Sequence, residues 1–161
     1  PVLLGEGRIF CTGGYGAGSA VLQLEEVGGR IAARCAKRLS ARQFGSEQHT
    51  PVFYEGHLYA VRTKPALENL VCLDASGNEL WNSGRDKFGR GPYLVADGLI
   101  FALSDQGLLV MAEATPAGYR PLDRFQVLPD AHDAWAPMAL VGGRLVLRDL
   151  TRMVCLDVAE K

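Results

Sequence analysis

The chain has 161 residues, of which 48% are hydrophobic and 22% charged, and its formal net charge is −1. This composition is typical of one globular domain and excludes a disordered chain. Charges of both signs are interspersed, so nothing indicates a nucleic-acid partner, and no apolar run approaches the roughly 20 residues that form a transmembrane segment. Nineteen glycines and eight prolines, spread along the chain, predict many turns between short strands.

A repeat organises the sequence. Four segments share an apolar strand, a turn that ends in glycine, and a second apolar strand. The aligned glycines, Gly7, Gly56, Gly98 and Gly143, are 49, 42 and 45 residues apart. Four-stranded propeller blades repeat every ~40–50 residues, so the spacing predicts an all-β chain of four antiparallel blades in one domain. The predicted blades, called units one to four below, cover residues of about 1–44, 45–86, 87–131 and 132–161.

In chain order, units one to three each contain four predicted strands, and unit four contains three. The last strand of unit one is ambiguous, because Ile31, Cys35 and Leu39 also fit the spacing of a short amphipathic helix. The repeat favours a strand there. The predicted strands are 1–5, 8–12, 19–26 and 30–38; then 50–54, 57–63, 69–74 and 78–82; then 92–96, 99–104, 108–113 and 119–127; and finally 137–141, 144–148 and 152–157.

The clearest hairpin lies in unit two, at residues 69–81. Gly77 is expected in its turn, because glycine adopts positive φ without steric cost, and Asp74 is expected to cap that turn. Trp81 follows in the next strand and is large enough to fill a gap between neighbouring units. By contrast, the charged residues within 148–152 of unit four predict a solvated hairpin.

Three segments carry a family resemblance: Phe44–Pro51, Leu73–Trp81 and Asp133–Pro137. On these the chain resembles the pyrroloquinoline-quinone (PQQ)-like β-propeller repeat proteins. That family includes the quinoprotein alcohol dehydrogenases and the propeller lipoprotein of the bacterial outer-membrane β-barrel assembly machinery. The resemblance implies an eight-bladed parent, of which this is the C-terminal half, and a tryptophan that docks between blades. Here the turn before Trp81 is one residue shorter than the family's usual Asp-x-x-Thr-Gly form.

Unit four lacks a fourth strand, so its last strand is expected to present unpaired N–H and C=O groups. We expect the missing strand to lie upstream of Pro1 in the parent. The two open blade faces predict that the chain pairs with the missing N-terminal half or with another copy of itself. Closure of four blades into one small ring is the alternative.

Candidate binding residues precede the first strand of each blade, where propeller loops surround the mouth of a central channel. Gln48, Arg90 and Trp135 each lie eight residues before an aligned glycine. These charged, imidazole, amide and indole side chains either converge on one pocket or serve only to hydrogen-bond the loop backbone. The full candidate set is Glu47, Gln48, His49, Arg90, His132, Asp133 and Trp135.

The predicted function is a non-catalytic propeller scaffold whose channel mouth binds a protein or a glycan. The alternative that the resemblance implies is a quinoprotein oxidoreductase dependent on PQQ and calcium. Dehydrogenases of that family use adjacent cysteines, calcium ligands and an Asp base, and no motif here matches them, so no catalytic residue, cofactor or metal ligand is assigned. The family's usual location predicts a periplasmic or secreted protein.

The four cysteines are predicted to be free and mostly buried thiols. Cys72 and Cys155 occupy the same position in units two and four, two blades apart. Cys11 and Cys35 are separated by one strand, or about 9.5 Å. Both separations exceed the ~7 Å between Cα atoms that a disulfide tolerates. Free thiols suit a reducing compartment as well as an oxidising one.

Overall fold

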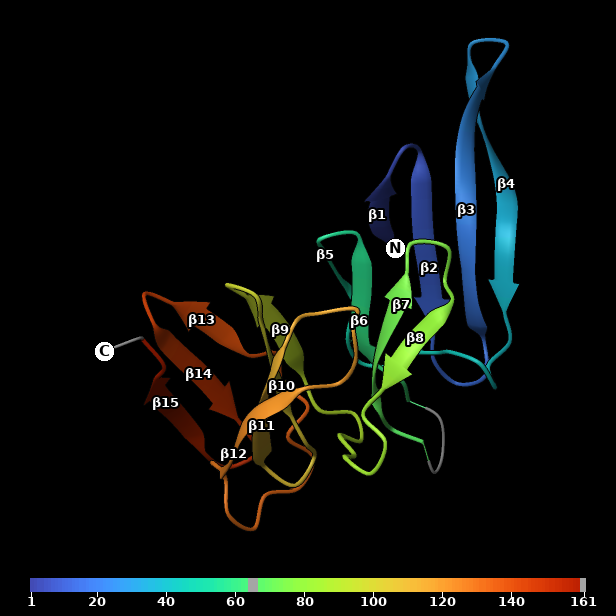
Figure 1. Cartoon of the computed structure of the whole chain (residues 1–161). Helices are drawn as coiled ribbons and strands as arrows, with labels where there is room; N and C mark the ends of the chain where they lie inside the picture. Colours follow the sequence, from blue (N-terminus) through green and yellow to red (C-terminus); the bar gives the residue numbers. More distant parts are fainter. Residues whose placement is uncertain (64–66, 160–161) are drawn as a thin grey trace.

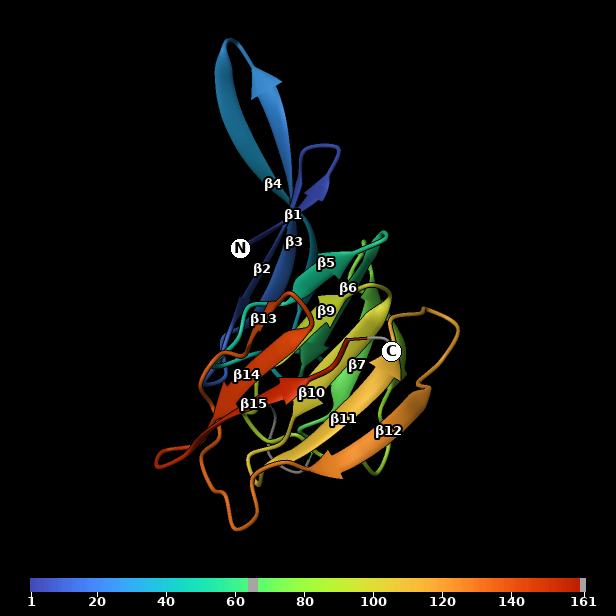
Figure 2. The ribbon, with the colours of Figure 1, turned by 90° about the vertical axis from the view of Figure 1, so that its left-hand side faces the viewer.

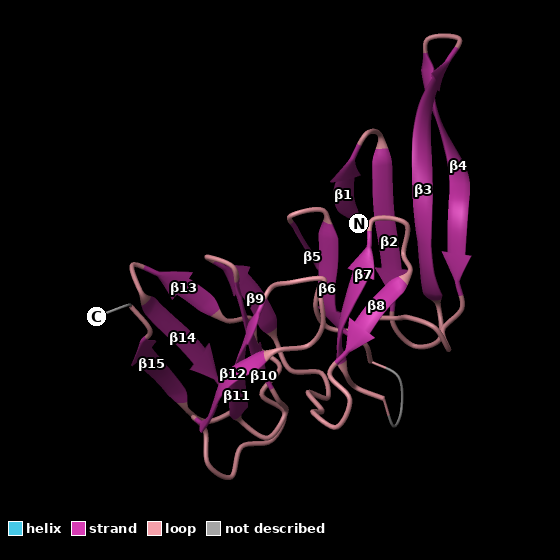
Figure 3. Cartoon of the chain, in the orientation of Figure 1, coloured by secondary structure: helices cyan, strands magenta, loops and turns pink. Residues whose placement is uncertain are grey.

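The computed structural model describes residues 1–63 and 67–159. These residues form fifteen strands and no helix (Figure 3). Each strand lies within two residues of its predicted bounds, so the all-β prediction is confirmed. The ambiguous segment of unit one is a strand. In the described part of the chain, no helix has the length and apolarity needed to cross a membrane.

Each unit forms one antiparallel sheet, and the strands of a sheet follow one another in chain order. The first sheet contains β1 (Val2–Gly5), β2 (Arg8–Gly13), β3 (Gly18–Val27) and β4 (Arg30–Leu39). The second contains β5 (Val52–Tyr54), β6 (His57–Val61), β7 (Leu70–Asp74) and β8 (Glu79–Asn82). The third contains β9 (Tyr93–Ala96), β10 (Leu99–Leu103), β11 (Leu108–Glu113) and β12 (Pro121–Gln126). The last contains only β13 (Ala139–Val141), β14 (Arg144–Arg148) and β15 (Met153–Asp157).

The four sheets follow one another in chain order like propeller blades (Figure 1). Their first strands lie on the inner side, where β1 contacts β5 and β5 contacts β9. Both views show the hairpin of β3 and β4 projecting beyond the other strands (Figures 1 and 2). β4 is exposed along most of its length. In such a meander, the loops between units and the β2–β3-type turns share one end of the molecule.

The apolar core lies between the sheets. One cluster of buried side chains joins units one, two and three and includes Phe10, Leu58 and Ile100. A second cluster joins units three and four and includes Phe101 and Leu145. Burial of apolar area, worth roughly 25 cal/mol per Å², therefore holds each sheet to its neighbours.

The turn of the unit-two hairpin is capped by Asp74. Its carboxylate accepts hydrogen bonds from the backbone N–H groups of Ser76 and Asn78, both at 2.8 Å. Partial burial raises the pKa of Asp74, but the hydrogen bonds from Asn78 and Ser76 outweigh it and hold the pKa below its ordinary value. Gly77 has φ of 77° and packs on the side chain of Leu39 in β4. The turn therefore rests on unit one.

Trp81, on β8, lies on the opposite face of the same sheet, against unit three. Its indole N–H donates to the carbonyl of Thr115 at 2.8 Å. The indole also packs near the ring of Tyr119, with centroids 5.8 Å apart. The short hairpin of unit two thus contacts unit one through Gly77 and unit three through Trp81.

The prediction that the cysteines are mostly buried is wrong. All four are free thiols, but only Cys72 is buried, Cys11 is half-buried, and Cys35 and Cys155 are exposed. β4 and β15 are the last strands of their sheets, and no described strand covers these positions. Burial raises the pKa of Cys72 to about 11.

The hairpin at residues 148–152 is exposed, as predicted, except at Asp149. Asp149 is buried, because its side chain folds back over the turn. Its Oδ1 accepts hydrogen bonds from the backbone N–H groups of Thr151 and Arg152, both at 2.7 Å. These bonds lower the pKa of Asp149 to about 2.

Candidate binding face at the channel mouth

An ion pair joins the loops that precede the second and third sheets. Arg90 Nε donates to Glu47 Oε2 at 2.6 Å, and this bond raises the pKa of the guanidinium. The Glu47 side chain is 8% exposed and that of Arg90 39%. Gly14, in the β2–β3 turn, makes room for the carboxylate, because a Cβ there would lie 2.2 Å from Glu47 Cγ. The pair therefore brings together loops of units one, two and three.

Trp135, from the loop before β13, extends this cluster into unit four. The guanidinium carbon of Arg90 lies 5.5 Å from the centroid of the indole, a cation–π distance. The indole N–H donates to Asp105 Oδ1 at 2.9 Å, and the backbone N–H of Arg90 donates to the same oxygen at 2.7 Å. Glu47, Arg90, Trp135 and Asp105 form one connected group, called the mouth cluster below.

Asp105 is the member that the sequence analysis missed. It lies in the turn between β10 and β11, and its backbone is hydrogen-bonded to Phe88 and Ala134 in the loops before the third and fourth sheets. Gly89 indicates the close approach, since a Cβ there would lie 1.9 Å from Asp105 Oδ2. Burial raises the pKa of Asp105, and the hydrogen bonds from Arg90 and Trp135 offset it only in part. The sequence could have indicated Asp105, because in an antiparallel meander the β10–β11 turn and the loops between units lie at the same end of the molecule.

The other predicted site residues lie around the mouth cluster. The ring of His49 packs edge-on to Tyr93, with centroids 5.9 Å apart, and burial lowers the pKa of His49. Among the described residues, its Nε2 has no hydrogen-bond partner. His132 and Asp133 are exposed and approach each other at 3.4 Å. Gln48 is exposed at the rim of a cleft of about 160 Å³.

The mouth cluster does not fit a calcium-bound quinone. Calcium takes six to eight oxygen ligands. Here the Glu47 carboxylate is paired with a guanidinium, and Asp105 Oδ1 accepts two N–H groups. Among residues 1–63 and 67–159, no group of three or more His, Cys, Asp or Glu side chains is arranged to hold a metal ion. The carboxylates of the mouth cluster therefore serve a structural polar network and are not arranged as metal ligands.

The comparisons with known proteins identify no relative of this chain. A search with protein-family models finds no match to the chain, and a search of curated proteins finds none. The class is therefore defined by the fold: an all-β chain of four antiparallel, propeller-like sheets. Its most distinctive polar feature is the mouth cluster, which connects loops of successive units.

Proposed function

We propose that this chain is a PQQ-like β-propeller scaffold without catalytic activity, whose channel mouth binds a protein or a glycan. The observation that carries the proposal is the mouth cluster. It fixes Arg90 and Trp135, two residue types enriched in binding hot spots, on loops held by rigid sheets. On the family resemblance, we place the chain in an eight-bladed periplasmic or secreted parent, where the remaining blades are its first partner.

The chemistry of the mouth cluster favours binding over catalysis. A general base must reach the proton it removes, and a nucleophile needs an adjacent base. Glu47 is buried under the guanidinium of Arg90, and Asp105 is engaged by Trp135. The exposed side chains around the mouth cluster are an amide at Gln48 and, from the loop before β13, an imidazole at His132 and a carboxylate at Asp133. Those groups suit hydrogen bonds to a polar ligand around an aromatic centre.

The proposal is tested by screening the whole chain against a glycan array and a peptide display library, then measuring each hit by calorimetry. Trp135→Ala should weaken a true ligand at least about tenfold, the effect expected for a hot-spot aromatic. Gln48→Ala should weaken it less. Arg30→Ala, an exposed change at the start of β4, is the matched control and should leave the affinity unchanged. Ligands that bind all three variants equally would contradict the proposal.

The competing quinoprotein hypothesis makes a different prediction. Binding of PQQ and Ca²⁺ to the folded state alone would stabilise it by RT ln(1 + [L]/Kd). We expect no rise in the unfolding temperature on their addition, because the mouth carboxylates are already engaged. A saturable rise, lost in Glu47→Gln, would favour the oxidoreductase.

A further inference from the structure

Arg62 occupies a position that two other units fill with a hydrogen-bond acceptor. The backbone N–H groups of Arg62, Ser104 and Asp149 each close the turn between the second and third strands of their unit. In unit three, Ser104 Oγ also accepts from the backbone N–H of Leu108 at 3.1 Å. In unit four, Asp149 Oδ1 accepts from that of Thr151 at 2.7 Å. A guanidinium carries only donors, so the side chain of Arg62 serves contacts outside its own turn.

The guanidinium of Arg62 is buried and only partly satisfied. The side chain is 8% exposed. Its Nη1 donates to Glu79 Oε2 at 2.6 Å and to the carbonyl of Gln43 at 3.3 Å. Its Nε is buried and has no hydrogen-bond partner among the described residues. A buried N–H without an acceptor carries the full cost of its desolvation, so an acceptor beside Nε would stabilise the folded chain.

Arg62 lines a cavity of about 360 Å³ between units one and two. One wall is the turn that contains Gly77. This turn packs on the surface of unit one that faces unit two, called its receiving surface below. A Cβ on Gly77 would lie 3.2 to 3.8 Å from three buried side chains of that surface, which are Phe10, Val21 and Leu39. Both walls therefore belong to units whose four strands are described.

The charged groups on this cavity are two cations and one carboxylate. Lys37, on β4, lines it together with Arg62 and Glu79, so one positive charge is in excess. The ammonium of Lys37 donates to the carbonyl of Gly77 at 3.2 Å and to the side-chain oxygen of Asn78. An ammonium has three N–H groups, so one remains for a ligand.

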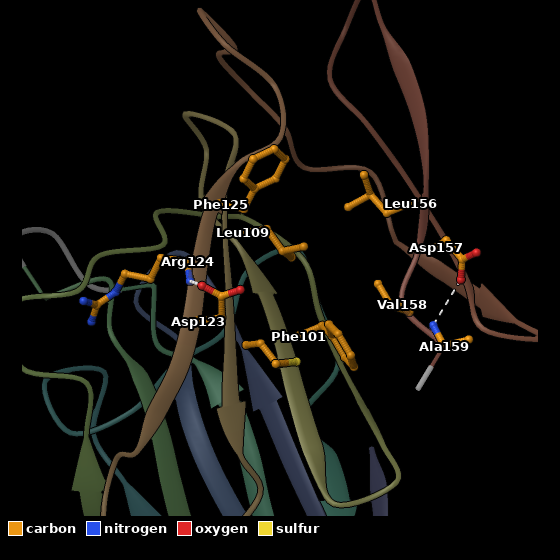
Figure 4. Close-up of a pocket in the computed structure, with 10 residues that line it drawn as sticks. Phe101, Leu109, Asp123, Arg124, Phe125, Leu156, Asp157, Val158 and Ala159 are labelled. Carbon is orange, nitrogen blue, oxygen red and sulfur yellow. Dashed lines mark hydrogen bonds between the residues drawn. The ribbon is translucent and has the colours of Figure 1, made fainter. Parts of the chain in front are cut away.

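The cavity between units three and four has a different lining. It measures about 400 Å³, is lined mainly by apolar side chains, and opens beside Phe125, which is 62% exposed (Figure 4). Arg124 also lines it, but its guanidinium is half-exposed and donates to Asp86 at 2.5 Å. A buried guanidinium with an unpartnered Nε therefore distinguishes the cavity between units one and two.

We propose that the cavity between units one and two binds a small organic carboxylate, whose oxygens accept from the guanidinium of Arg62 and the ammonium of Lys37. The planar guanidinium matches the geometry of a carboxylate. One positive charge in excess matches one carboxylate, whereas a phosphate monoester carries about −1.5 to −2 at pH 7 and would be repelled more strongly by Glu79. The lining also includes three apolar side chains for the rest of the ligand: Leu39, Phe44 and Leu73.

This site is separate from the mouth cluster. None of the four residues of that cluster lines the cavity. A glycan or protein at the channel mouth and a carboxylate between units one and two can therefore fail as ligands independently. Trp135→Ala, which should weaken a ligand at the mouth, should leave the binding of a carboxylate here unchanged.

The test is an NMR titration of the whole isotope-labelled chain with benzoate at neutral pH and constant ionic strength. We expect saturable shifts of the Arg62 Nε–H signal and of the backbone amides of Gly77 and Glu79. Benzamide has the same shape without the charge and should bind at least about tenfold more weakly. Inorganic phosphate should also bind more weakly than benzoate.

Three variants separate binding from a purely structural role. Arg62→Lys keeps the charge but loses the planar fork, so it should weaken benzoate at least about tenfold. Arg34→Lys is the matched control, because Arg34 also pairs with a carboxylate, that of Glu25 at 3.5 Å, but is exposed and outside the cavity. It should leave the affinity unchanged. Glu79→Gln, at a side chain that is 35% exposed, removes the competing carboxylate and should strengthen benzoate binding several-fold.

Five results would overturn the proposal. The first two are no saturable shift with benzoate and equal binding of benzamide. The third is tighter binding of phosphate, which would assign the cavity to phosphate ligands. The fourth is the same affinity for benzoate in Arg62→Lys and Arg34→Lys. The last is a loss of benzoate binding in Trp135→Ala, which would place benzoate at the mouth cluster.

Discussion

The interface between units two and three differs from that between units three and four, although the same sheet geometry builds both. At the first, the receiving surface around Trp81 is buried and a loop of unit three covers it. At the second, Phe125 remains exposed beside an open cavity. Among the described residues, unit three has four strands and unit four has three, so only the first of these interfaces includes a connection to a fourth strand.

The contrast indicates which part of a blade closes an interface. The inner strands of unit four bury Leu145 and Leu147 against unit three, so they account for the inner part of the core. They do not reach the outer part, where Phe125 lies. The turn that leads into the fourth strand is what seals it, because that turn lies directly over the outer part of the preceding sheet.

The greatest loss of stability is expected at Phe10, which can be compared with Phe101 at the equivalent position of unit three. Phe10→Ala removes a fully buried side chain beneath a sealed surface and should lower the free energy of unfolding by about 3–5 kcal/mol. Phe101→Ala should cost less, because water can enter from the open cavity beside it. Urea unfolding of both variants measures the difference. Equal losses would contradict the assignment of one interface as sealed and the other as open.

A smaller effect is expected at the indole that joins units two and three. Trp81→Phe keeps an aromatic ring but leaves the Thr115 carbonyl without its donor, which should cost about 1–3 kcal/mol. Trp135→Phe, in the half-exposed mouth cluster, is the control. Water can replace its bond to Asp105, so its cost in thermal or urea unfolding should be the lower of the two. A larger cost for Trp135→Phe would reverse the ranking.

Two turn glycines separate backbone strain from contact with a neighbouring unit. Gly77 and Gly56 have φ of 77° and 80°, and alanine at either position should cost about 1–2 kcal/mol in the left-handed region. A Cβ at Gly56 meets open space, whereas one at Gly77 meets Leu39 at 3.2 Å. Gly77→Ala should therefore be slightly the more destabilising in urea unfolding. Identical values would show that the turn yields to the added methyl group.

The smallest effect is confined to acid. The folded pKa of Asp149 is about 2, below the ordinary 3.8, so its stabilising contribution is present above pH 3.8 and is lost as the pH falls toward 2. The pKa of Asp105 is raised, so its ionisation opposes folding as the pH rises above the ordinary value. Unfolding midpoints between pH 2 and 6 should be less acid-sensitive in Asp149→Asn and more acid-sensitive in Asp105→Asn. The same response in both variants would contradict these signs.

The strands could be predicted from the amino-acid sequence, because their signals are local. Alternating apolar residues and turn glycines specify each hairpin, and a period of 42 to 49 residues specifies four units. The capping role expected of Asp74 depends on residues within four positions. In the structure, its carboxylate accepts hydrogen bonds from the backbone N–H groups of Ser76 and Asn78. Gly77 likewise has the positive φ that its turn requires.

The contacts between the sheets could not be predicted in this way, because they join residues far apart in the sequence. Asp105 meets Trp135 across 30 positions, and Arg90 meets Glu47 across 43, so no local pattern relates them. The exposure of Cys155 and Phe125 depends on a fourth strand that no described residue supplies, because whether a side chain is buried is set by its neighbours in space and not by its own strand.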